Sequence, residues 1–195
     1  MPVFLDKVAD FLRSESFVNQ SYAAACIEKL LLRKTTTPDG SGQTGHPIFT
    51  PVNVQPEVLQ KLLQGLCELL SQSKNLYAMR SLYRTVQLAQ GQILSFADTL
   101  GQILGSFINA AALDESTTSP NYLYILFETT ALTLRHLKGT AQFESVENQL
   151  IQSLGIIIER NISDMMSYAF QIFALFVANS QQLTQIYRDL MSSIL

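Results

Sequence analysis

The sequence is poor in charged residues and has no excess of basic ones. Charged residues make up 15% of its 195 residues, below the quarter that is usual in soluble domains. The net charge is −3, from 13 basic and 16 acidic side chains. Because a nucleic-acid-binding protein normally needs a basic surface, this composition argues against nucleic acid as a partner. It indicates a chain that buries much of its surface or belongs to something larger.

Cysteine and histidine are also scarce. Cys26 and Cys67 are far apart, and each lies within an apolar helical pattern. We expect free buried thiols rather than a disulfide or a metal site, which suits a reducing compartment. His46 and His136 have no ligand at metal-binding spacing. No order of Ser, His and Asp and no nucleophile motif is present, so we expect neither an enzyme nor a cofactor.

The sequence lacks an apolar run long enough to cross a membrane. The longest candidate, Met165 to Ala178, has 14 residues and contains Ser167 and Gln171, whereas a membrane-spanning helix needs about 20. The first ten residues contain acids and no long apolar core, unlike a signal peptide. We therefore expect a soluble intracellular protein without membrane insertion.

Apolar residues recur at helical spacing almost throughout the chain. The clearest stripe runs from Ile93 to Ala111 in steps of three and four. No stretch of comparable length alternates with the period of two that is typical of strands. Signals such as Ser119–Pro120 and Lys138–Gly139 mark helix starts and stops. We expect helices at 2–13, 17–33, 56–73, 76–90, 92–113, 120–138, 141–159, 162–179 and 181–194.

Taken in order, these helices form antiparallel pairs. Their first helices begin at intervals close to those of HEAT or armadillo repeats, which are roughly 40–47 residues long. The sequence predicts an all-α HEAT-repeat solenoid of about four and a half repeats. Residues 1–195 would form a single segment with a disordered or flexible loop at 35–55. The helices at 120–138 and 162–179 are apolar nearly all round, as is typical of helices covered by neighbouring repeats.

The last expected helix, 181–194, carries an apolar stripe and no polar outer face. Terminal repeats of a solenoid normally need such a face for solubility. We therefore expect the chain to be an excerpt of a longer solenoid that can self-associate through this end.

Two short motifs need an interpretation of their own. The stretch GSGQTG, Gly40 to Gly45, has the letters of a dinucleotide-binding fingerprint, but the prolines that follow forbid an immediate helix. We interpret it as part of an inter-helix loop. Asn161, with Asp164 three residues later, is interpreted as an approximate capping box at the start of a helix.

Basic residues recur on the second helix of successive pairs, mostly toward the same end. They could form one ridge for an acidic partner. Alternatively, each could complement the macrodipole at the C-terminus of its own helix. The candidate partner-binding residues are Lys29, Arg33, Lys34, Arg80, Arg84, Arg135 and Lys138.

Four segments of the chain carry a family resemblance. In chain order they are LRSESFVNQSYAAACIEKLLLRK (Leu12 to Lys34), NLYAMRSLYRTV (Asn75 to Val86), NYLYILFETTALTLR (Asn121 to Arg135) and YAFQIFALFVAN (Tyr168 to Asn179). They resemble, in the same order, segments from the middle of the CAS/CSE family of nuclear exportins, which re-export importin-α.

The resemblance implies a HEAT-repeat superhelix of the importin-β superfamily and a non-enzymatic transport receptor. It implies importin-α and Ran-GTP as partners, with shuttling through the nuclear pore between nucleus and cytoplasm. Proteins of the family are several times longer, and their N-terminal repeats that grip Ran have no counterpart here. The alternatives are a generic helical-repeat scaffold and another transport receptor of the importin-β type.

Overall fold

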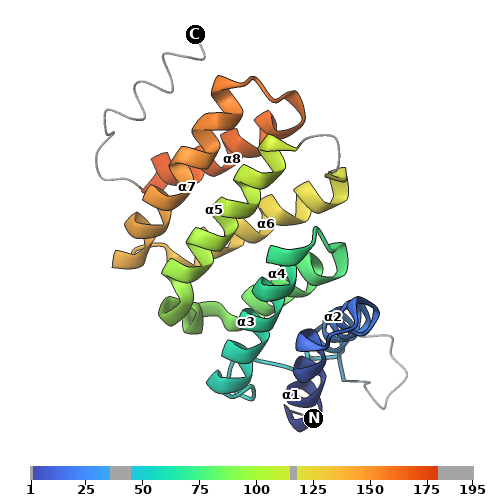
Figure 1. Ribbon diagram of the computed structural model, residues 1–195. Helices are drawn as coiled ribbons and strands as arrows, with labels where there is room; N and C mark the ends of the chain where they lie inside the picture. The colour runs from blue at the N-terminus through green and yellow to red at the C-terminus, as the bar shows by residue number, and fades with distance from the viewer. Residues whose placement is uncertain (1, 36–44, 115–117, 180–195) are drawn as a thin grey trace. The chain divides into compact units, whose positions relative to one another are not determined.

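The computed structural model describes residues 2–35, 45–114 and 118–179. In these residues the backbone is helical apart from turns and one isolated bridge. The elements are α1 (Pro2–Asp10), the 3-10 helix η1 (Phe11–Arg13), α2 (Phe17–Leu31), α3 (Pro56–Gln72), α4 (Leu76–Ala89), the 3-10 helix η2 (Gln90–Phe96), α5 (Ala97–Leu113), α6 (Pro120–Leu137), α7 (Ala141–Glu159) and α8 (Ser163–Asn179). Figure 1 shows them in chain order from blue to red.

The chain divides into two compact units, Met1–Gln92 and Ile93–Leu195. In the first unit, α1 packs on α2 and α3, while α4 packs on α2 and α3. One helix pair therefore lies against the next. Ile27, Leu62 and Leu82 of three different helices are fully buried between them, as apolar stripes at helical spacing predict.

The second unit repeats this arrangement with α5 to α8. Here α5 packs on α6 and α7, and α8 packs on α6 and α7. Its core includes Leu104, Leu126 and Leu154, all fully buried. In both units each helix contacts its partner in the pair and its counterpart in the other pair, as HEAT-type repeats do. The predicted all-α helical-repeat fold class is confirmed.

Part of the sequence prediction falls outside the described residues. The described part of the chain holds four helix pairs. The helix expected at 181–194, its apolar stripe and most of the GSGQTG stretch lie outside it. The repeat number, the single-segment organisation and self-association through the end therefore stay predictions.

Two helix boundaries differ from those expected by more than two residues. The helix predicted at 92–113 begins only at Ala97, after a 3-10 stretch from Gln90 to Phe96. Gln90 has a φ of 46°, a conformation that L-residues seldom adopt and that breaks the helical run. The helix predicted at 2–13 changes to a 3-10 turn at Phe11. Apolar periodicity does not register such a change, because 3-10 turns often extend a helix end.

The interpretation of Asn161 as a helix N-cap is wrong. Asn161 has a φ of 52° and follows Arg160, the C-cap of α7. Its N–H donates to the Ile158 carbonyl at 3.0 Å, and the N–H of Ile162 donates to the Ile157 carbonyl at 3.1 Å. This pair of bonds closes a helix through a left-handed residue, a conformation that Asn tolerates. Asn161 therefore ends α7, and α8 begins at Ser163.

The two helices that the sequence predicts to be enclosed, α6 and α8, differ in how much of their surface is buried. In α6 the buried positions include Thr129, Thr130 and Thr133 besides the expected aliphatic and aromatic residues, so this helix is enclosed as predicted. In α8 Phe170 remains 39% and Val177 43% exposed. Within the described part of the chain, α8 is therefore covered on one side.

Candidate interaction surface

The cations expected to form a ridge all lie on or just after even-numbered helices. In the first unit, Lys29 belongs to α2, and Arg80 and Arg84 belong to α4. Arg33 and Lys34 follow the end of α2 as exposed residues. In the second unit, Arg135 lies in the last turn of α6 and Lys138 caps that helix. Whether the two groups form one ridge stays a prediction, and each unit is considered by itself.

Polar contacts fix α2 against α4 in the first unit. Asn75 caps α4 by accepting hydrogen bonds from the N–H groups of Tyr77 and Ala78. The same side chain donates from Nδ2 to Ser21 Oγ at 2.7 Å. Further along, Ser81 donates its hydroxyl to the carbonyl oxygen of Ala24. Since these groups are buried or half-buried, they set the register between the two helices.

The ends of α2 and α4 enclose a groove of about 490 Å³. Two of the predicted cations, Lys34 and Arg84, line it together. The other lining residues are mainly apolar, among them Leu31, Phe49 and Leu88. Lys29, Arg33 and Arg80 do not belong to this lining. The structure therefore brings together one pair of the candidate site residues.

The segment from Pro47 to Pro51 forms one wall of the groove. The N–H of Thr35 donates to the His46 carbonyl at 2.9 Å, and the N–H of Ile48 donates to the Arg33 carbonyl at 3.0 Å. These bonds frame an isolated antiparallel bridge between Lys34 and Pro47. Asn53 continues the wall by donating from Nδ2 to the Ile48 carbonyl at 2.8 Å. This part of the expected 35–55 loop is therefore hydrogen-bonded, while residues 36–44 lie outside the described chain.

Phe49 gives this wall a hydrophobic anchor. Its side chain is only 4% exposed, although it lies between two prolines in a segment without regular secondary structure. Helical periodicity cannot identify such a residue, because its burial depends on contacts with distant helices. The sequence signal was the apolar pair Ile48 and Phe49 between two prolines.

The guanidinium of Arg84 is held by its own helix. Nη1 donates to Gln87 Oε1 at 2.9 Å, and the guanidinium carbon lies 5.1 Å from the centroid of the Tyr83 ring. Both contacts leave its positive charge unneutralised. No carboxylate in the described residues forms an ion pair with Arg84 or Lys34.

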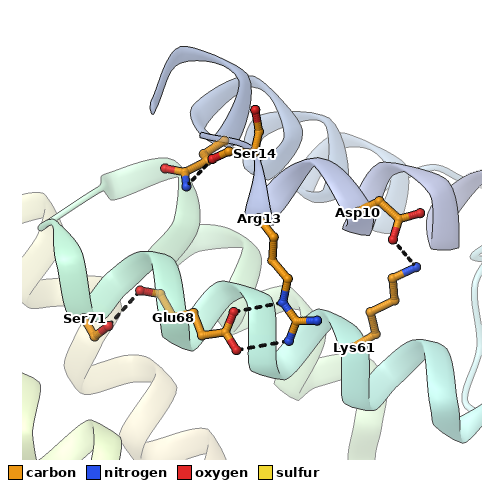
Figure 2. A network of polar contacts seen from close by, with 7 residues as sticks. Asp10, Arg13, Ser14, Lys61, Glu68 and Ser71 are labelled. Atoms are coloured by element: carbon orange, nitrogen blue, oxygen red, sulfur yellow. Dashed lines mark hydrogen bonds and ion pairs between the residues drawn. The ribbon is translucent and has the colours of Figure 1, made fainter. Parts of the chain in front are cut away.

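Other basic residues of the first unit are paired in a cluster that the sequence did not reveal. Lys61 Nζ lies 2.7 Å from Oδ1 of Asp6 and 2.7 Å from Oδ1 of Asp10. Arg13 donates two hydrogen bonds to the Glu68 carboxylate, at 2.9 and 3.0 Å. Figure 2 shows Asp10 and Arg13 facing Lys61 and Glu68 across the contact of α1 and η1 with α3. The four-residue spacing of the two aspartates, which places them on one helix face, was the available signal.

Hydrogen bonding raises the pKa of both cations in this cluster. For Lys61 the main causes are the hydrogen bonds to Asp10 and then Asp6. For Arg13 the main cause is the hydrogen bond to Glu68. Because these pairs lie at the surface, with Lys61 half-buried and Arg13 exposed, each contributes at most about 1 kcal/mol. The cluster therefore helps to hold α1 on α3 rather than forming a site for chemistry.

No constellation of catalytic type was found among the described residues. Cys26 and Cys67 are free thiols, but only Cys67 is buried as predicted, and Cys26 is half-buried. Burial raises the pKa of Cys67 to about 12. A thiol with such a pKa stays protonated and unreactive near neutral pH. In the described part of the chain no three His, Cys, Asp or Glu side chains group together as metal ligands.

The second unit has a smaller hollow of its own. It measures about 260 Å³ and lies at the starts of α6 and α8, where Leu123, Met165 and Tyr168 line it with Asp164. No cation of the expected ridge belongs to its lining. Within the described residues, no helix has the length and hydropathy required to span a membrane.

Comparison with known proteins agrees with the sequence resemblance. Exportin-2 of Pagrus major is 26% identical over 170 residues, and that of Homo sapiens is 24% identical over 177 residues. Exportin-2 of Drosophila melanogaster is 28% identical over 176 residues. The alignments cover 84%, 89% and 87% of this chain but only 16%, 17% and 17% of the relatives. The chain therefore spans a small part of the length of these relatives.

A family model also matches most of the chain. The model of "CAS/CSE protein, C-terminus" matches residues 39–195, which include α3 to α8. It describes the C-terminal part of such proteins, whereas the sequence resemblance pointed to the middle. No solved structure matches the chain significantly. Because the matched range is well over half of the sequence, the chain belongs to the CAS/CSE protein family.

Proposed function

We propose that this chain is a segment of a nuclear transport receptor that returns importin-α to the cytoplasm in complex with Ran-GTP. The observation that carries the proposal is the family match over residues 39–195. Relatives named Exportin-2 support it. In this proposal the protein shuttles through the nuclear pore and acts by binding, without catalysing a reaction.

The helical-repeat architecture suits this role physically. Each helix contacts its partner and its counterpart in the other pair of its unit, so small shifts at successive interfaces can add up to a large change in pitch. Two ligands that favour the same curvature would then bind cooperatively, and each would strengthen the other equally. We infer that the segment supplies part of this elastic curvature and contacts partners through its even-numbered helices.

The competing proposal is a generic helical-repeat scaffold. Such a scaffold needs no cooperation between a cargo and a nucleotide-bound GTPase. Dependence on the nucleotide state of Ran therefore separates the two, since only the export receptor must distinguish the GTP form from the GDP form.

The test is a capture experiment with a full-length protein that carries this segment. It would be immobilised and offered importin-α together with Ran locked in either its GTP or its GDP form. Capture of importin-α with the GTP form alone would support the re-export role. Capture that ignores the nucleotide, or no capture, would favour the scaffold.

A parallel lane with residues 1–195 alone would show whether the segment contributes contacts. Charge reversal at Arg135 and Lys138, compared with reversal at Arg33 and Lys34, would show which even-numbered helix the partner touches. Loss of capture with one of these double variants and not with the other would show which unit contains the contact.

A further inference from the structure

The groove at the ends of α2 and α4 combines apolar walls with positive charge that no carboxylate of the described residues neutralises. Leu31, Phe49 and Leu88 supply apolar surface, and Lys34 and Arg84 supply the charge. Among the described residues that line it, none carries a carboxylate. A ligand that fills it must therefore bring both apolar surface and negative charge, because either one alone leaves part of the lining without a partner.

Within the described residues, the cations of the groove have no carboxylate partner, in contrast to two other cations of the same unit. Lys61 and Arg13 are neutralised by carboxylates at 2.7 and 2.9 Å. Lys34 and Arg84 form no ion pair within the described residues. Arg84 is nevertheless oriented, because Gln87 accepts one of its N–H groups at 2.9 Å. An oriented guanidinium loses less entropy when it binds a carboxylate than a freely rotating one does.

The walls of the groove are built to hold their shape. On one side, α2 and α4 are joined through Asn75 and Ser81. On the other, Thr50 N–H donates to Asn53 Oδ1 at 2.9 Å, and Gln92 Nε2 donates to the Pro51 carbonyl at 2.7 Å. A pre-formed groove avoids much of the ordering cost of binding.

We propose that this groove binds an acidic peptide segment of a partner protein, with an apolar side chain seated between carboxylates that meet Lys34 and Arg84. The volume of about 490 Å³ is suited to a few side chains rather than a folded domain. A nucleic acid fits poorly, because the lining is mainly apolar and the chain carries a net charge of −3. The proposal does not depend on the re-export role.

The test uses residues 1–195 and three short fluorescent peptides of equal length. One alternates Glu and Leu, one alternates Glu and Ser, and one alternates Lys and Leu. Fluorescence anisotropy would measure the affinity of each at low and at physiological salt. We expect the Glu and Leu peptide to bind best and to weaken as salt rises. Equal binding of the Lys and Leu peptide would overturn the proposal, because it would remove the role of charge.

Charge reversal then locates the site. The variant Lys34→Glu/Arg84→Glu should weaken the Glu and Leu peptide about tenfold or more. The matched control Lys7→Glu/Arg160→Glu changes the net charge equally at two exposed residues outside the groove lining, and it should bind like the unaltered chain. Equal losses in both variants would mean that only net charge matters, which would overturn the proposal.

Two further measurements test whether misfolding or nonspecific binding explains the result. The milder variant Lys34→Gln/Arg84→Gln removes both charges without adding repulsion and should weaken binding in the same direction. A Glu and Leu peptide with a photoreactive group should crosslink to residues 47–51 and 84–90. Crosslinks confined to other segments would show that the peptide binds elsewhere.

Discussion

Ser153 donates its hydroxyl to the carbonyl oxygen of Gly105 at 3.0 Å, and at this point α7 lies directly against α5. One turn earlier, a Cβ atom placed on Gly101 would lie 2.3 Å from Gln149 Oε1 and 3.0 Å from Val146 Cγ2. The Gln149 side chain can move aside, but Val146 is fully buried and β-branched. The two glycines therefore allow the close approach of these helices.

Gly101→Ala is expected to lower the free energy of unfolding by about 1–3 kcal/mol. The gain in helix propensity, about 1 kcal/mol, offsets only part of a cost in the upper half of this range. Urea denaturation would measure the change from the midpoint and slope. Gly91→Ala is the control, because a Cβ there meets nothing within 4 Å. If both variants are equally stable, the close packing of α5 on α7 does not limit this position.

Asn75→Ala should cost more stability than the loss of a helix cap alone. The side chain caps α4 and also bonds Ser21 on α2, so its removal loses about 1 kcal/mol for the cap and about 1 kcal/mol more for the link between helices. Ser119→Ala is the matched control, since Ser119 only caps α6, through the N–H of Tyr122. Thermal unfolding of both would show the difference, and equal losses would rule out the second role.

Lys61→Met should lower stability at neutral pH by up to about 1 kcal/mol. Hydrogen bonds to Asp10 and Asp6 raise the folded-state pKa of Lys61. The stabilisation is therefore fully present below the ordinary pKa range of lysine and is lost as the pH rises through the raised value. Melting temperatures of the two proteins should differ at neutral pH and converge in strongly alkaline buffer. A difference that persists there would mean that Lys61 acts through packing of its carbon chain.

His136 should make the protein less stable in mild acid. Burial lowers its pKa, and its Nε2 has no hydrogen-bond partner within the described residues. The unfolded chain binds a proton more readily, so stability falls as the pH drops through the ordinary histidine range toward the lowered value. His136→Leu should flatten this part of the profile of stability against pH. Equal slopes in the unaltered protein and in the variant would contradict the assignment.

The fold class could be predicted because apolar spacing follows directly from helix geometry. Caps such as Ser119 and the stop at Gly139, with a φ of 77°, were also visible in the sequence, since a few side-chain types dominate these positions. Asn161 was misinterpreted because Asn suits both a helix start and a left-handed helix stop. Only the hydrogen bonds of the neighbouring residues distinguish the two.

The interaction surface could be predicted only in part. The repetition of cations on second helices identified Lys34 and Arg84 as candidates, but their pairing in one groove depends on how α2 and α4 pack. The burial of Phe49 and the ion pairs of Lys61 also join segments far apart in the chain. Such contacts follow from tertiary packing, for which a single sequence carries no periodic signal.

The buried threonines of α6 affect how that helix can move. Thr129, Thr130 and Thr133 each donate their hydroxyl to a carbonyl oxygen of α6 itself, at 2.7, 3.0 and 2.8 Å. These three hydroxyl groups are hydrogen-bonded within α6, and none of the three bonds joins α6 to a neighbouring helix. The contact with α8 includes the stacked rings of Phe127 and Tyr168, whose centroids lie 5.1 Å apart.

Such a contact resists separation more strongly than sliding, because flat apolar surfaces can slip past one another while they stay dry. The link between α2 and α4 is different, since Asn75 and Ser81 bond across it. Under mechanical load, α6 should therefore slide along α8 more readily than α4 slides along α2.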